Sequence, residues 1–151
     1  MTLRPCLAGL ALIVAGCSAP DPAARPAQAS VVQVADAVCR PTPPGRRMTL
    51  CYLTLTASTN DALIEASSPR AGRVALHDVP FENGMVVLTP RSGPIGLPAG
   101  QAVRLAPGGQ ALALQGVQTP MTAGQTVPIT LTFNLAPAVE TVARVEAEPA
   151  A

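Results

Sequence analysis

Apolar residues recur at every second position between Val127 and Leu135, and the residues between them are proline, threonine or asparagine. Successive side chains of a β-strand point to opposite faces, so this period gives one apolar and one polar face. Pro128 falls on the polar face and predicts an edge position, because proline cannot donate a hydrogen bond to a neighbouring strand. The pattern predicts a half-buried strand over residues 127–135.

Turn residues divide the rest of the chain into similar short runs. The chain has 17 prolines and 12 glycines, but one tyrosine, two phenylalanines and no tryptophan. Long helices are disfavoured, because each proline removes a backbone donor and each internal glycine loosens a helix. Further strands are predicted over residues 32–38, 48–57, 73–79, 85–89, 102–105, 110–117 and 139–145. Short strands at this spacing, with turns such as Asn83-Gly84 between them, predict an all-β antiparallel sandwich or barrel.

Residues 1–16 have the features of a bacterial lipoprotein signal peptide. Arg4 supplies a positive charge, and the apolar run that follows is far shorter than the roughly 20 residues that span a membrane. The stretch Val14-Ala15-Gly16-Cys17 resembles a lipobox, which predicts cleavage before Cys17 and attachment of lipid to that cysteine. An ordinary signal peptide is the alternative.

The residues after the cleavage site predict how the protein is held at the membrane. Ser18 resembles the outer-membrane sorting class, so we expect a lipid anchor in the outer membrane, on the periplasmic side of the envelope. Residues 17–30 are rich in proline and alanine and predict an extended tether that starts at the lipidated cysteine. The folded domain is expected over residues 31–146, and residues 147–151 are expected to form a disordered tail.

Two cysteines remain once Cys6 is removed with the signal peptide and Cys17 carries lipid. These are Cys39 and Cys51, and disulfides persist in an oxidising compartment such as the periplasm. Their pairing is one interpretation. The other is two buried thiols on neighbouring strands, because the sequence does not show whether their Cα atoms lie within the roughly 7 Å that a bridge requires.

Charge and motif content exclude several classes of function. Ten basic residues and nine acidic residues nearly cancel, so the chain has no basic surface of the kind that binds nucleic acid. No motif connects a nucleophile to His77, the single histidine, and Asp78 would point to the opposite face of a strand. We therefore expect no enzymatic activity and no catalytic residue.

Several short motifs occur in a fixed order along the expected domain. They are Asp36-Ala37, Arg40 with Thr42-Pro43-Pro44-Gly45, Tyr52-Leu53-Thr54-Leu55-Thr56, Ser67-Ser68-Pro69, Ala71-Gly72-Arg73-Val74, Leu76-His77, Leu97-Pro98-Ala99-Gly100, Leu105-Ala106-Pro107-Gly108-Gly109, and Gly124 with Thr126-Val127-Pro128. Together they resemble the PCu(A)C family of periplasmic copper chaperones, which carry Cu(I) toward the CuA centre of cytochrome oxidase. The resemblance implies a cupredoxin-like antiparallel β-sandwich of the Greek-key type, and a partner in copper trafficking or oxidase assembly.

The resemblance also implies a copper site made of a histidine, a later methionine and a His-x-Met pair. Imidazole and thioether donors suit Cu(I). His77 stands at the first histidine, but the methionine position falls on Leu88 and the His-x-Met pair falls on Ala111 and Ala113. Met85 is a substitute for the lost methionine only if a bulge intervenes, because an odd offset puts it on the opposite face from Leu88.

Two interpretations of His77 and two functions stay open. His77 is either a copper ligand or a solvated side chain at the end of a strand. In the first function the protein is a copper(I) carrier with a degenerate site at His77, completed by Met85 or by a partner. In the second it binds no metal and is a structural or protein-interaction module of the cell envelope.

Overall fold

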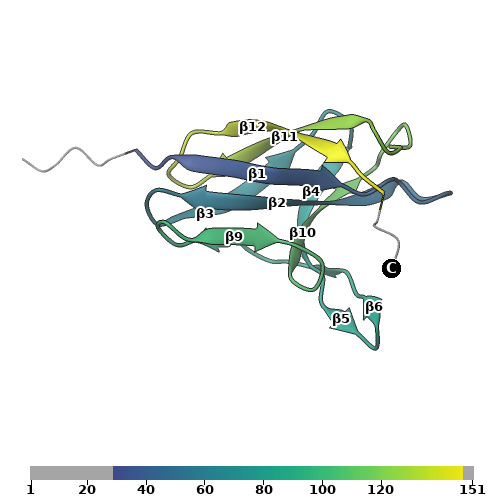
Figure 1. Ribbon diagram of the computed structural model, residues 1–151, viewed down its shortest axis with the longest axis horizontal. Helices are drawn as coiled ribbons and strands as arrows, with labels where there is room; N and C mark the ends of the chain where they lie inside the picture. The colour runs from purple at the N-terminus through teal and green to yellow at the C-terminus, as the bar shows by residue number, and fades with distance from the viewer. Residues whose placement is uncertain (1–28, 148–151) are drawn as a thin grey trace, which may run out of the picture.

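The computed structural model describes residues 29–147, and its regular structure there consists of β-strands (Figure 1). The strands are β1 (Val32–Cys39), β2 (Met48–Ala57), β3 (Asp61–Ser67), β4 (Arg73–Asp78), β5 (Phe81–Glu82), β6 (Met85–Val86), β7 (Thr89–Pro90), β8 (Ile95–Leu97), β9 (Ala102–Leu105), β10 (Gln110–Gln115), β11 (Thr126–Phe133) and β12 (Val139–Val145). The all-β prediction is confirmed. No helix in the described part is long and apolar enough to cross a membrane.

The predictions for the two ends of the chain fall mostly on residues that the structure does not describe. The signal peptide 1–16 and the lipidation site Cys17 lie outside the described residues. So do all but the last two residues of the tether 17–30 and all but the first residue of the tail 147–151.

One large sheet holds most of the strands, in the order β7-β4-β10-β2-β1-β12-β11-β3-β8, with β9 paired to β2. The pairs are antiparallel except for β1 and β12, which run parallel, with Val38 opposite Arg144. β3 and β4 come from opposite ends of this order and also contact each other. The sheet therefore curls around a single core, as Figure 1 shows.

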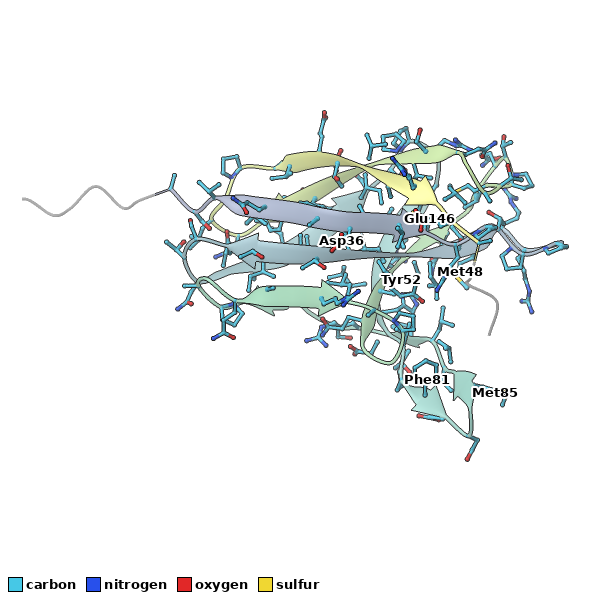
Figure 2. All side chains as sticks on the ribbon, viewed as in Figure 1. Asp36, Met48, Tyr52, Phe81, Met85 and Glu146 are labelled. Atoms are coloured by element: carbon cyan, nitrogen blue, oxygen red, sulfur yellow. A yellow bond between two sulfur atoms is a disulfide. The ribbon has the colours of Figure 1, made fainter. Side chains whose placement is uncertain are left out.

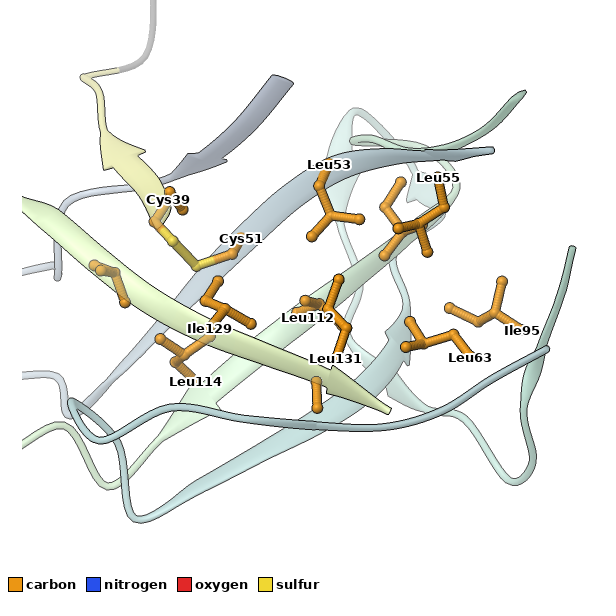
Figure 3. Close-up of a cluster of buried hydrophobic side chains, with 14 of the residues drawn as sticks. Cys39, Cys51, Leu53, Leu55, Leu63, Ile95, Leu112, Leu114, Ile129 and Leu131 are labelled. Atoms are coloured by element: carbon orange, nitrogen blue, oxygen red, sulfur yellow. A yellow bond between two sulfur atoms is a disulfide. The ribbon is translucent and has the colours of Figure 1, made fainter. Parts of the chain in front are cut away.

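Aliphatic side chains from several strands fill that core, as Figure 3 shows. The alternating residues of β11 are buried up to Phe133, as the period predicts. Leu135 departs from the pattern: it is 62% exposed, because the strand ends at Phe133. The carboxylate of Asp61 then accepts hydrogen bonds from the backbone N–H groups of Leu135 and Ala136, at 2.9 and 2.8 Å, and turns the chain away from the core.

The predicted edge position of Pro128 is wrong. β11 lies inside the sheet, between β12 and β3. Pro128 is tolerated there because the pairing with β3 begins only at Thr130, which is opposite Ser67. The Ser68 hydroxyl donates to the Pro128 carbonyl at 2.7 Å, so a side chain satisfies this carbonyl beyond the end of the pairing with β3.

The predicted strand over residues 85–89 is also wrong. Phe81 to Val86 form a separate two-stranded hairpin, β5–β6, which projects from the large sheet in Figure 1. Asn83 and Gly84 have φ values of 52° and 78°, as a tight hairpin turn requires. This turn leads into β6, which ends at Val86, and the chain joins the large sheet only at β7.

A disulfide joins Cys39 on β1 to Cys51 on β2. The two residues are opposite each other in the antiparallel ladder, and their Cα atoms are 4.0 Å apart. Both are fully buried in the core cluster that Figure 3 shows. The bridge therefore ties together two adjacent strands from within the core.

Candidate functional site

His77 lies within β4, and its side chain is 5% exposed. On one side it faces Ala111 of β10, and on the other it faces Pro90 of β7. The Nδ1 atom lies 3.5 Å from the carbonyl oxygen of Ala75, at the outer limit of a hydrogen bond. The interpretation of His77 as a solvated side chain at a strand end is wrong, because β7 and β10 flank it inside the sheet.

The strand next to His77 is buried on both faces. Alternate residues of β10 point to opposite sides, so Leu112 and Leu114 enter the core while Ala111 and Ala113 face outward. Ala111 is directly opposite His77, and Ala113 is directly opposite Ala75. The two positions that the resemblance assigns to a His-x-Met pair therefore lie on the same face as His77. Methyl side chains occupy both, and a methyl group cannot coordinate copper.

Leu88 is part of a small apolar cluster on this outer face. It packs, half-buried, against a cluster formed by Tyr52, Val79 and Ala111. The position that would hold a thioether sulfur next to Ala111 is therefore filled by a hydrocarbon side chain. The resemblance placed Leu88 near the other ligand positions, and the packing of Leu88 on the Ala111 cluster agrees with that placement.

Met85 is separated from His77 by the fold. It lies on β6 in the projecting hairpin (Figure 2) and is 68% exposed. His77, in contrast, is buried in the large sheet. Among residues 29–147, no three histidine, cysteine, aspartate or glutamate side chains form a group that could hold a metal ion. Of the four positions that the resemblance assigns to copper ligands, all within the described residues, one carries a donor, and this donor is the imidazole of His77.

An apolar groove of about 410 Å³ opens on the same outer face. Its apolar lining is Pro41, Pro43, Met48, Leu50, Tyr52, Phe81, Val86, Leu88 and Pro107. The Arg40 guanidinium lies 5.9 Å from the centre of the Tyr52 ring, and both residues line this groove. The groove was not predicted from the sequence. Its one local signal was the apolar Phe81 and Val86 on either side of an Asn-Gly turn, where side chains are usually polar.

Solved structures define the class of protein to which this fold belongs. A copper-bound PCuAC domain from PmoF2 is 25% identical, with a TM-score of 0.64, and the match covers 78% of this chain and 93% of that domain. Apo-DR1885 from Deinococcus radiodurans is 27% identical, with a TM-score of 0.59, and the match covers 97% and 96% of the two chains. The cupredoxin-like fold expected from the resemblance is confirmed.

The sequence also places the chain in a particular family. The family model described as "Putative lipoprotein LpqE-like" matches residues 32–145. The chain belongs to this LpqE-like lipoprotein family. A relative from Leifsonia xyli subsp. xyli (strain CTCB07), described as "Putative lipoprotein Lxx21020", is 30% identical over 131 residues, which are 85% of this chain and 79% of that protein.

Proposed function

We propose that the protein is a copper-chaperone-like lipoprotein, anchored by lipid at Cys17 in the outer membrane and working on the periplasmic side. The observation that supports this most is the position of His77, which is buried on β4. The residue directly opposite on β10 is Ala111, a position that the resemblance assigns to the copper site. The fold is shared with a domain whose structure is described as copper-bound. In this proposal the imidazole of His77 is the protein's own copper(I) donor.

One imidazole gives a weak site. Cu(I) is bound best by several soft donors such as thioethers together with imidazole, and Leu88, Ala111 and Ala113 supply none. A second donor then comes from the Met85 thioether after a movement of the β5–β6 hairpin, or from a partner protein. Such a site passes copper on more readily than it stores copper, and the CuA assembly of cytochrome oxidase is the proposed destination.

The second candidate is a structural or interaction module of the envelope that binds no metal. The observation in its favour is that hydrocarbon groups stand at all three of the other ligand positions and continue into the apolar groove. In this case His77 is a buried side chain that fills space next to Ala111, and the groove binds a partner without copper.

A competition experiment separates the two candidates. The domain, with its Cys39–Cys51 disulfide kept oxidised so that thiols do not compete for the metal, is titrated against a chromogenic Cu(I) chelator under ascorbate. Wild type is expected to withdraw about one equivalent of Cu(I) from a weak chelator, and His77→Ala to withdraw none. Leu88→Met restores a thioether beside Ala111 and is expected to bind Cu(I) more tightly than wild type, as a second soft donor requires.

Two results would decide against copper. If wild type and His77→Ala withdraw the same amount of Cu(I), His77 is not the donor. If in addition the melting temperature is the same with and without Cu(I), the second candidate is favoured, because a ligand that binds the folded state alone must raise it.

A further inference from the structure

Two hollows adjoin each other on the outer face of the sheet. The first is the apolar groove of about 410 Å³, and the second, the polar hollow, is a cavity of about 330 Å³. Arg40, Tyr52 and Pro107 line both. Both volumes fall within the range of roughly 300–1,000 Å³ that is usual for ligand sites. A ligand that spans the junction at Tyr52 therefore contacts both hollows.

The outer face changes from apolar to polar along β2. Leu53 and Leu55 belong to the main core, so the alternate residues Leu50, Tyr52 and Thr54 point outward. Leu50 lines the groove, Thr54 lines the polar hollow, and Tyr52 lies between them. A strand rises about 3.3 Å per residue, so Leu50 and Thr54 are about 13 Å apart. An amphiphile that lies along β2 thus meets apolar side chains at one end and polar side chains at the other.

The polar hollow carries charges of both signs. Thr54 is opposite Arg104 on β9, and on its other side it is opposite the residue that precedes Asp36 on β1. The exposed side chains of Asp36 and Arg104 therefore flank Thr54, and within residues 29–147 they form no ion pair with each other. Arg40, over the Tyr52 ring, adds a positive charge at the junction. The hollow is thus complementary to a group that holds an anion and a cation together.

A bulge in β1 aims Asp36 at the polar hollow. Ala35 is opposite Thr54 and Val38 is opposite Tyr52, and the register shifts between these two pairs. Regular alternation would turn the residue after Ala35 toward the core. Asp36 instead has a φ of 52°, a left-handed conformation that is uncommon outside glycine, and it lines the outer hollow. Bulges often re-aim a side chain in this way beside a functional site.

The β5–β6 hairpin holds an apolar wall beside the groove. Phe81 and Val86 are opposite each other, so they share one face of the hairpin, and both line the groove. The Phe81 ring packs on Gly108, where a Cβ atom would lie 2.9 Å from a ring carbon. Val79 fixes the base: its carbonyl accepts from the Gly108 N–H at 3.0 Å, and its N–H donates to the Gly109 carbonyl at 2.8 Å. The wall is therefore held in place although Phe81 stays 60% exposed.

We propose that the two hollows together bind a single-chain zwitterionic phospholipid. The acyl chain lies in the groove between the hairpin and Leu88, the phosphate lies at Arg104, and the ammonium group lies at Asp36. Tyr52 lies where the chain meets the head group, and its apolar ring and hydroxyl suit that boundary. Figure 2 shows Asp36, Tyr52 and Phe81 in this order, from the middle of the sheet toward the hairpin. A purely anionic head group leaves Asp36 unmatched, so the two charges together favour the zwitterion.

This proposal does not depend on copper. Among the described residues, those that line the two hollows do not include His77. His77→Ala should therefore leave lipid binding unchanged while it removes Cu(I) binding. A failure of either proposal leaves the other standing.

The test uses the single tyrosine as its probe. The chain has one tyrosine and no tryptophan, so its intrinsic fluorescence reports the environment of Tyr52. The protein is titrated with dodecylphosphocholine at concentrations below those at which micelles form. Dodecyl maltoside, which has the same chain and an uncharged head group, should bind about five- to tenfold more weakly, as two exposed charge contacts imply. Octylphosphocholine should bind at least about tenfold more weakly, because its shorter chain buries less apolar surface.

Four variants locate the two parts of the ligand. Arg104→Gln and Asp36→Asn each remove one charge, and each should weaken dodecylphosphocholine binding about threefold while leaving dodecyl maltoside binding unchanged. Asparagine is chosen because it tolerates the left-handed conformation. Phe81→Ser should weaken binding of both probes about fivefold, because it removes part of the apolar wall. Val142→Ser is the matched control: Val142 is 61% exposed on β12, outside the groove, and its loss should change neither affinity.

Three results would overturn the proposal. Equal affinity of wild type for the phosphocholine and maltoside probes would mean that the polar hollow recognises no head group. Tighter binding of dodecyl phosphate than of dodecylphosphocholine would mean that Asp36 holds no ammonium group. An effect of Val142→Ser as large as that of Phe81→Ser would mean that the probes adsorb to any exposed apolar side chain.

Discussion

β10 is buried on both faces, and the two faces are built from different side chains. Leu112 and Leu114 point inward and join the main core. Ala111 and Ala113 point outward, toward the face that carries His77. The inner face depends on large aliphatic groups that fill the barrel of strands. The outer face consists of the methyl groups of Ala111 and Ala113, and the half-buried Leu88 packs against the cluster that contains Ala111. We therefore expect side chains on the outer face to change with little effect on the fold.

This difference means that side chains on the outer face can be exchanged while the protein keeps its shape. Leu88 and Ala111 contribute to a small cluster with Tyr52 and Val79, separate from the main core. A substitution at these positions changes the chemistry of the outer face. A replacement on the inner face would leave a cavity in the densely packed interior.

The largest expected effect is on the inner face. Leu114→Ala should lower the free energy of unfolding by about 4 kcal/mol, toward the upper part of the measured range for buried leucines, because Leu114 is fully enclosed. Urea unfolding followed by circular dichroism measures the loss. Ala113→Gly, the neighbouring position on the other face, serves as the matched variant and should cost far less. Equal losses in the two variants would contradict the comparison of the faces.

Loss of the disulfide is the second test of the inner face. The double variant Cys39→Ala/Cys51→Ala should lower the free energy of unfolding by about 3 kcal/mol, because the bridge closes a short loop in the unfolded chain. Urea unfolding under non-reducing conditions measures it. Wild type reduced with dithiothreitol keeps both cysteine side chains but lacks the bridge, so it separates the effect of the cross-link from that of packing. A loss below about 1 kcal/mol would mean that the bridge adds nothing to the ladder between β1 and β2.

The inner face was well predicted from the sequence. Period-two alternation in Val127 to Phe133 depends only on which residues are apolar, and that pattern is local. The failures at Pro128 and Leu135 have a different origin. Each depends on a contact made by a residue about 60 to 75 positions away, the Ser68 hydroxyl for Pro128 and the Asp61 carboxylate for Leu135. No window of sequence around the affected residue contains those partners.

The outer face could be predicted only in part. The resemblance assigned Ala111 to the neighbourhood of His77, and the ladder register between β4 and β10 agrees with it. The sequence did not reveal the burial of His77, because burial there depends on β7, a two-residue strand that follows the hairpin. The groove was also missed, since it is lined by segments that are distant in sequence.

Asp61 lies outside the two faces of β10, and its carboxyl allows a separate test of how stability depends on pH. Burial raises the pKa of the Asp61 carboxyl, but hydrogen bonds from the backbone N–H groups of Ala62, Leu135 and Ala136 outweigh it and hold the pKa below its ordinary value of 3.8. The carboxylate form is thus favoured by folding. Its contribution to stability is complete above the unfolded pKa and is lost as the pH falls through the lower pKa of the folded protein.

Asp61→Asn should therefore lower the free energy of unfolding by about 1–2 kcal/mol at pH 7 and should reduce the further loss on acidification. Urea unfolding at pH 7 and near pH 3 measures both. The cost of Leu114→Ala should be the same at the two pH values, because Leu114 is remote from the carboxylate. An unchanged acid response in Asp61→Asn would show that another group controls it.

The smallest effect is expected at Leu88 on the outer face. Leu88→Ala should lower the free energy of unfolding by about 1 kcal/mol, because a half-buried leucine removes only part of its apolar surface from water. Leu88→Met is the matched control: its similar volume should keep the cost smaller still. Both are measured by urea unfolding beside Leu114→Ala. A loss at Leu88 as large as that at Leu114 would show that the outer face contributes as much to stability as the core does. Side chains on the outer face would then not be free to change.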